Sequence, residues 1–139
     1  MRIVTAMRWI MLVSGLLTTT MVYAALDPQA AMQSTFGETI DGAAADIVVR
    51  SWGALIALVG LMLIYGAFDT AARPLVLGVA GASKLVFIGL VLSHGTRFLG
   101  PAALPVAVDS VMVLLFAWYL VASWRTPARP AATSMTAPV

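Results

Sequence analysis

Four long apolar segments set the strongest limit on the fold of this chain. They cover residues 9–26, 52–68, 74–94 and 104–124. Each approaches the roughly 20 residues that a helix needs to cross a bilayer. Hydrocarbon offers no partner to backbone N–H and C=O groups, so only helices or closed barrels can cross it. Since the segments are continuously apolar and do not alternate in polarity, we expect four membrane-spanning helices.

The composition predicts an all-α integral membrane protein. Hydrophobic residues make up 61% of the 139 residues and charged residues only 10%, whereas a soluble domain is about 45–50% apolar and about 25% charged. We expect one four-helix bundle over residues 1–124, with up-down-up-down topology because the later links are short. The link before the fourth segment, residues 95–103, contains Gly95, Gly100 and Pro101 as helix breakers. Residues 125–139 are predicted to form a disordered cytoplasmic tail. The chain has no cysteine, which excludes disulfides and thiolate metal sites.

The first apolar segment has a second interpretation. Arg2 and Arg8 precede it, and Val22-Tyr23-Ala24 resembles a signal-peptidase site, so the segment could be a leader that is removed. Removal would leave three spans. We expect the first helix to be retained, and the sequence leaves the cleaved leader open as the alternative.

The arginines predict how the protein is oriented in the membrane. Cytoplasmic loops carry an excess of lysine and arginine. With the N-terminus inside, the cytoplasmic arginines are Arg2, Arg8, Arg73, Arg125 and Arg129, and the outer ones are Arg50 and Arg97. We therefore expect both termini to face the cytoplasm.

The first loop, residues 27–49, is predicted to hold a short amphipathic helix outside the membrane. Asp27 suits the cap of such a helix and Pro28 its first position, while Gly37 is expected to end it. Three apolar residues recur at four-residue spacing and would form one face. They are Met32, Phe36 and Ile40.

Two further sets of residues are interpreted as structural. Asp46 and Arg50 lie four residues apart at the start of the second long helix, with the acid first, and should form a surface ion pair. Trp9, Trp52 and Trp124 mark the ends of three spans and are expected to act as interfacial anchors.

Lys84 and Asp109 are the main candidates for a functional site, because each lies inside an apolar segment. A charge near the bilayer centre costs about 2.5–3.5 kcal/mol on insertion scales, and such residues face a bundle interior and pair. From the helical rise, Lys84 should lie about 15 Å and Asp109 about 7 Å below the outer end. A direct pair would then require Lys84 to reach outward. Arg50 and His94 are rival partners for Asp109, and we treat all four as one candidate functional polar cluster.

His94 is the only histidine, and Gly95, which follows it, is expected to form the C-cap of the third span. A helix C-terminus favours a protonated histidine, so capping explains this position. Haem ligation through His94 is an alternative, although we predict no cofactor and no metal site. Membrane lipids are the expected partners, with no nucleic acid.

Small residues recur at helical spacing in three spans, and in the first of them they are Ser14 and Thr18. Gly53, Ala57 and Gly60 share one stripe, and Gly78, Ala82 and Gly89 share another. Such stripes let helix backbones approach closely. They predict tight packing within the bundle, or else the interface of a homo-oligomer or larger membrane complex.

The order of these features resembles a family of small bacterial four-span proteins without an assigned function. The resemblance covers residues 27–124 and rests on four short signals. These are Phe36-Gly37-Glu38, Arg50-Ser51-Trp52-Gly53, Arg73 and Asp109. It implies a bacterial inner membrane protein and carries no activity or site residue.

Three functions fit the sequence. The first is a non-enzymatic structural or interaction subunit, or a homo-oligomer, whose buried charges order the bundle. The second is a small proton- or ion-linked transporter, and the third is an intramembrane enzyme acting on a lipophilic substrate. The last two would use Lys84, Asp109 and His94. The small-residue stripes favour the first function.

Overall fold

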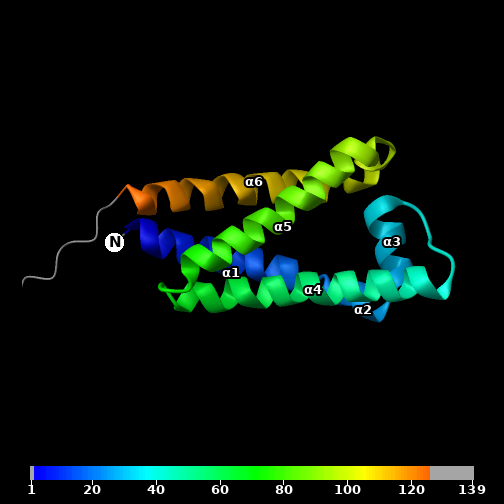
Figure 1. Ribbon diagram of the computed structural model, residues 1–139, viewed down its shortest axis with the longest axis horizontal. Coiled ribbons are helices and arrows are strands. Elements are labelled where there is room, and N and C mark those ends of the chain that lie inside the picture. The colour runs from blue at the N-terminus through cyan, green and yellow to red at the C-terminus, as the bar shows by residue number, and fades with distance from the viewer. Residues whose placement is uncertain (1, 126–139) are drawn as a thin grey trace, which may run out of the picture.

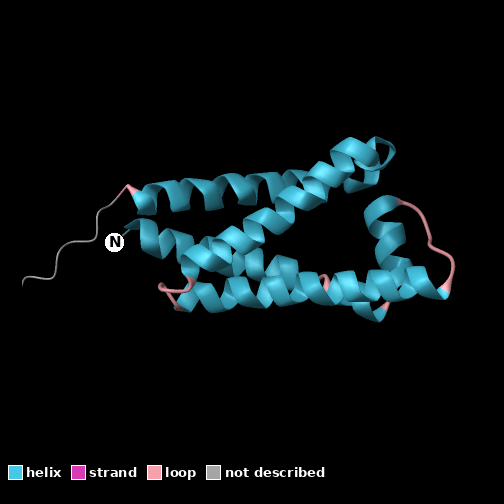
Figure 2. Ribbon diagram, viewed as in Figure 1, coloured by secondary structure: helices cyan, strands magenta, loops and turns pink. Residues whose placement is uncertain are grey.

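The computed structural model describes residues 2–125, which form helices joined by loops and contain no strand (Figures 1 and 2). The elements are α1 (Arg2–Thr19), α2 (Val22–Leu26), α3 (Pro28–Phe36), α4 (Ala43–Phe68), α5 (Arg73–His94), η1 (Thr96–Phe98) and α6 (Leu99–Trp124). Four stretches are long and apolar enough to cross a membrane, namely Val4–Leu26, Ala43–Phe68, Arg73–His94 and Thr96–Trp124. The predicted all-helical class is therefore confirmed, with four helices that could cross a membrane. The predicted tail lies outside the described residues, apart from Arg125.

The last helix begins earlier than the sequence predicted. Gly100 and Pro101 were expected to break the chain before residue 104, yet α6 starts at Leu99. A proline in the first turn is tolerated, because the N–H groups there have no partner within the helix. Pro105 then lies inside α6.

The first loop contains α3, which begins and ends where the sequence predicted. The Asp27 carboxylate accepts a hydrogen bond from the Ala30 N–H at 3.1 Å, and Gly37 ends the helix with a left-handed φ of 73°. Ile40 lies beyond the helix. Its backbone is held by the Gln29 side chain, which donates to the Ile40 carbonyl at 2.6 Å and accepts from the Ile40 N–H at 3.2 Å.

The long helices form two pairs. In one pair, α1, which is followed by α2, lies along α4, and in the other α5 lies along α6 (Figure 1). The small residues of α4 make the first pairing possible. A Cβ added to Gly60 would lie 2.5 Å from the Thr19 nitrogen and 2.8 Å from the Gly15 oxygen, and one added to Gly53 would lie 2.7 Å from Ala24 Cβ. The helix backbones are therefore in direct contact along this face of α4.

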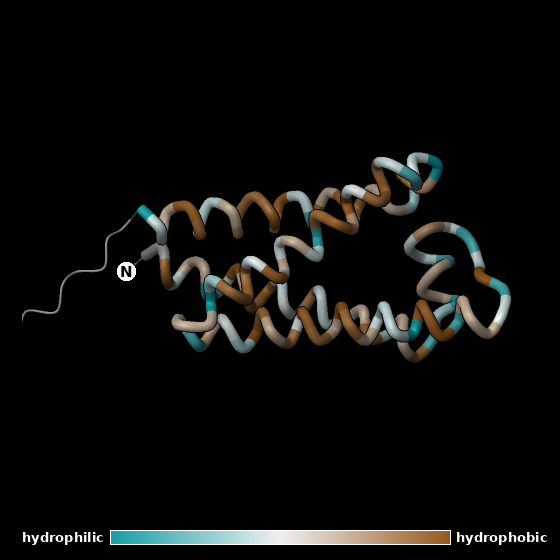
Figure 3. Tube along the Cα trace, in the orientation of Figure 1, coloured by the Kyte–Doolittle hydropathy of each residue, from teal (hydrophilic) through white to brown (hydrophobic). Residues whose placement is uncertain are grey.

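The start of α1 and the end of α6 lie at one end of the molecule, and α3 lies at the other (Figure 1). We call these the Arg73 end and the α3 end. The larger buried core belongs to the Arg73 end, and its members are Met7, Met11, Leu63, Ala67, Val76, Leu77, Ala80, Phe116 and Tyr119. A smaller core of Ala24, Ala31 and Val49 joins α2, α3 and α4. Hydrophobic residues continue along the outside of all four long helices (Figure 3), as a bilayer requires.

Candidate functional site

Lys84 joins three helices at the middle of the bundle. From α5, its Nζ contacts the Asp109 carboxylate on α6 and donates to Thr18 Oγ1 on α1 at 3.4 Å. The Lys84 side chain is only 10% exposed and that of Asp109 is 20% exposed. The Lys84 cluster therefore adds a polar link between the two helix pairs, which the larger apolar core also joins.

The predicted offset in depth between the two charges is wrong. Lys84 lies ten residues before the end of α5, and Asp109 lies ten residues after the start of α6. At the same rise per residue, the two therefore lie at similar depth. The error came from placing the start of the fourth span at residue 104. No outward reach of the lysine is needed for the pair to form.

A cavity of about 540 Å³ opens beside this pair, between α1, α4, α5 and α6. Its wall is mostly apolar, with Leu17, Ile56, Val59, Phe87, Val108 and Met112 among the lining residues. Its polar lining includes Ser14, Thr18, Lys84 and Asp109. Ser14 Oγ is buried and has no hydrogen-bond partner in the part of the chain that the structure describes. The cavity therefore combines an apolar wall with one polar region.

Arg50 and His94 are not partners of Asp109, so the four residues do not form one cluster. Arg50 pairs with Asp46, with Nε 2.7 Å from Oδ2, and its Nη1 donates to the carbonyls of Ala25 and Leu26 at 2.7 and 3.0 Å. These bonds hold α4 to the end of α2, because that helix end leaves its carbonyls without partners. The predicted surface pair is present, and it occupies the arginine.

His94 lies at the α3 end, where its Nδ1 is 2.7 Å from Ser93 Oγ. It lines a second, apolar cavity of about 370 Å³. Phe36 of α3 separates the helices there, with ring centroids 5.6 Å from Phe98 and 6.4 Å from Trp52. Trp52 borders both cavities, unlike Trp9 and Trp124, which are 64% and 81% exposed. Interfacial anchoring therefore suits the two exposed tryptophans better than Trp52.

Arg73 is a buried cation that the sequence interpretation missed. It was read as a cytoplasmic turn residue, yet it is 2% exposed. Nε donates to the Gly66 carbonyl at 3.1 Å and Nη2 to the Ala67 carbonyl at 3.0 Å, while Nη1 lies 3.4 Å from the Val4 carbonyl and 3.5 Å from the Tyr119 hydroxyl. Its bonds thus reach α4, α1 and α6. Only the tertiary arrangement distinguishes this arginine from an ordinary loop charge.

The turn before Arg73 is organised by Asp69. Its Oδ1 accepts from the N–H groups of Ala71 and Ala72 at 2.9 and 3.2 Å, and its Oδ2 accepts from the Tyr65 hydroxyl at 2.8 Å. These hydrogen bonds, led by that from Tyr65, hold the pKa of Asp69 below its ordinary value of 3.8. The turn is therefore built around an ionised carboxylate.

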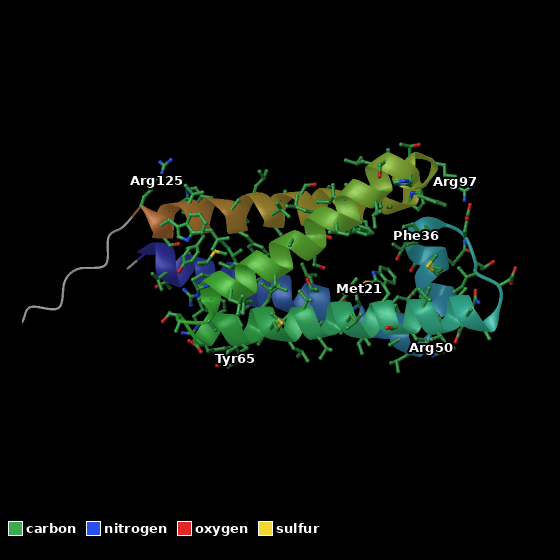
Figure 4. The ribbon with its side chains drawn as sticks, viewed as in Figure 1. Met21, Phe36, Arg50, Tyr65, Arg97 and Arg125 are labelled. Carbon is green, nitrogen blue, oxygen red and sulfur yellow. The ribbon has the colours of Figure 1, made fainter. Side chains whose placement is uncertain are left out.

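The α3 end carries a second exposed ion pair. Arg97 Nη2 lies 3.4 Å from Glu38 Oε2 and joins the α5–α6 connection to the loop after α3. Figure 4 places Arg50 and Arg97 at this end, and Tyr65 and Arg125 at the opposite end. Each of these two arginines is thus paired with an acid, Arg50 with Asp46 of α4 and Arg97 with Glu38 of the loop after α3.

Comparisons with protein-family models, with curated proteins and with solved structures found no match. The functional argument therefore depends on the residues and contacts described above.

Proposed function

We propose that this protein is a structural or interaction subunit of the bacterial inner membrane, which associates with itself or with another membrane protein. The observation that carries the proposal is the outward face of α5. A Cβ added to Gly78 or Gly89 would meet no atom within 4 Å, and Ala82 between them is exposed. This stripe allows another helix to approach closely.

The matching stripe on α4 supports this reading by contrast. Gly53 and Gly60 are already filled by α2 and α1. The small-residue stripe on α4 is therefore covered by helices of the same chain, whereas the stripe on α5 is uncovered. Because lipid tails are as apolar as leucine, helices in a bilayer associate through such close packing and not through hydrophobic burial. The outer α5 face is thus the surface best suited to a partner helix.

The buried cations support a structural role. Lys84 contacts groups on α1 and α6, and Arg73 contacts groups on α1, α4 and α6. Each cation fixes the relative positions of several helices. A bundle held in this way can present the α5 face in one defined geometry. The up-down-up-down course and a retained first span belong to this proposal, since α1 supplies partners to both cations.

The absence of cysteine makes the interface directly testable. Gly78→Cys and Gly89→Cys each add the sole thiol of the chain at an open position. Oxidation in native membranes should then give disulfide-linked dimers, if copies meet through this face. Leu114→Cys is the matched control, because Leu114 is 70% exposed on α6. Dimers that form equally at Leu114 would contradict a defined α5 interface. A linked product of another mass would indicate a different partner protein.

The proposed topology places both termini in the cytoplasm and the α3 end outside. Its support is the distribution of arginine and acid between the two ends. A further cysteine variant, Glu38→Cys, tests this orientation, because it adds a thiol at an exposed position of the first loop. A membrane-impermeant thiol reagent should label it in intact cells. Labelling that requires broken cells would overturn the orientation.

A further inference from the structure

The cavity beside Lys84 and Asp109 has the features of a ligand site. Ligand pockets have volumes of about 300–1,000 Å³, apolar walls and a few well-placed polar groups. This cavity has a volume of about 540 Å³ and an apolar wall drawn from four long helices. Ser14 and Thr18 lie one turn apart on α1, and Lys84 bonds to Thr18. A ligand head at this point would meet several polar atoms at once.

Ser14 is the observation that points to a bound molecule. Its side chain lines the cavity and is 1% exposed, and its Oγ has no hydrogen-bond partner within residues 2–125. Other hydroxyls on the long helices bond to their own backbone, such as Thr19 to the Gly15 carbonyl at 2.8 Å and Ser110 to the Val106 carbonyl at 2.7 Å. A buried hydroxyl without a partner is unfavourable. Ser14 is therefore positioned to bond a group that enters the cavity.

The charges and donors define the chemistry of that group. Lys84 has three N–H donors, of which one meets Asp109 and one meets Thr18. The third N–H and the hydroxyl hydrogens of Ser14 and Thr18 can serve a ligand. The Asp109 carboxylate balances the lysine charge, so an anionic head would have an unfavourable neighbour. The site thus offers donors without net charge.

We propose that this cavity binds a lipophilic molecule whose neutral head accepts hydrogen bonds through a carbonyl oxygen. This inference goes beyond the proposed interaction role and does not depend on it. Leu17, Leu55 and Leu90 line the cavity, yet they are more than half exposed, at 52%, 60% and 56%. They mark a lateral opening toward the hydrocarbon. Thr35 of α3 lines the cavity as well, and α3 covers the end of the bundle.

Two kinds of membrane molecule carry this chemistry, namely quinones and neutral acyl esters. The experiment therefore titrates decyl-benzoquinone and monooleoylglycerol against the protein in phosphatidylcholine nanodiscs. Trp52 lines the cavity and reports binding by its fluorescence. The other tryptophans, Trp9, Trp118 and Trp124, are exposed and are replaced by phenylalanine. At least one neutral probe should change the Trp52 emission saturably.

The variants test whether the signal comes from this site. Ser14→Ala removes one hydrogen bond and should weaken binding by about three- to tenfold. Ser110→Ala is the matched control, because that hydroxyl is bonded to its own helix and does not line the cavity. Its affinity should equal that of the parent protein. Val108→Phe reduces the cavity from α6 and should abolish the response. All variants are compared at equal helicity by circular dichroism.

Each outcome decides the proposal. The proposal is supported if the quinone, the ester or both bind saturably, and if Ser14→Ala weakens this binding while Ser110→Ala does not. The probe that binds then identifies the kind of ligand. A response that does not saturate, or that is unchanged in both Ser14→Ala and Val108→Phe, overturns it. Oleate has an anionic head and monooleoylglycerol a neutral one, so tighter binding of oleate would contradict the proposal of a neutral head. The cysteine-linking result at Gly78 is independent, so failure here leaves the proposed interface in place.

Discussion

Arg73 and Lys84 are both buried cations in an apolar bundle, but they are stabilised in different ways. Lys84 has a carboxylate partner in Asp109. The hydrogen bonds of Arg73 go to three carbonyls and the Tyr119 hydroxyl, all of them neutral groups. Two of those carbonyls, Gly66 and Ala67, belong to the last turn of α4. A helix C-terminus carries a partial negative charge, which favours a cation there.

The contrast explains why one cation lies in a filled core and the other lies beside a cavity. The guanidinium has five donors and can satisfy several carbonyls around it. Neighbouring helices can then close on Arg73, which bonds to Ala67 and Tyr119 of the main core. Lys84 carries a compact ammonium charge, and a single carboxylate partner, Asp109, neutralises it. The space beside Lys84 is not required by its own bonding and remains open to a ligand.

The largest expected effect comes from leaving Lys84 without its carboxylate. Asp109→Leu should destabilise the protein by about 3–5 kcal/mol, because it leaves an unpaired buried charge. The double variant Lys84→Met with Asp109→Leu should recover most of this loss, since neither charge remains. Thermal midpoints in detergent give the coupling between the two positions. A double variant as unstable as the sum of the single ones would argue against a direct pair.

Arg73 should behave differently, because it has no carboxylate to remove with it. Arg73→Leu leaves the Gly66 and Ala67 carbonyls without their donor and should cost about 2–4 kcal/mol, at about 1–2 kcal/mol for each of the two carbonyls, the lower part of the range for an unsatisfied buried group. Arg73→Lys should recover only part of this, since an ammonium lacks the planar fork. Equal stability of Arg73→Lys and the parent protein, measured by the same thermal midpoint, would show that charge alone suffices.

Two hydroxyl deletions should shift stability in opposite directions. Ser14→Ala removes a buried hydroxyl without a partner and should stabilise the ligand-free protein by about 1 kcal/mol. Tyr119→Phe removes an acceptor of Arg73 and should destabilise it by about 0.5–1 kcal/mol. Chemical unfolding of both variants in one detergent provides the comparison. A loss of stability in Ser14→Ala would mean that its hydroxyl already has a partner.

The smallest effect concerns Asp69 in the turn before Arg73. Its pKa is lowered in the folded protein by the Tyr65 hydroxyl and by backbone N–H groups. A lowered pKa stabilises the fold above the ordinary value of 3.8, and this contribution is lost as the pH falls below it. Asp69→Asn should therefore show a flatter decline of thermal midpoint below about pH 4. Identical pH profiles would remove Asp69 from the acid response.

Much of the fold follows from local patterns in the sequence. The four apolar segments predict the spans, and Asp27-Pro28 and Gly37 predict the bounds of α3 correctly. The start of α6 was predicted five residues late, because Pro101 was read as a breaker although a first-turn position suits it. That one boundary produced the wrong depth for Asp109. A glycine after a helix, such as Gly37, predicts the helix end well. A proline such as Pro101 is harder to interpret, because it suits both a break between helices and the first turn of a helix.

The sequence by itself determined the membrane class, the helical content and the two charges that needed a buried environment. The reason is that the cost of exposing polar groups to hydrocarbon acts on each segment alone. Only the tertiary structure decided that Lys84 pairs with Asp109, that Arg50 does not contact Asp109, and that Arg73 is buried. Those choices depend on which helices are neighbours. Helix neighbours are set by side-chain packing and close backbone approach, which no single segment encodes.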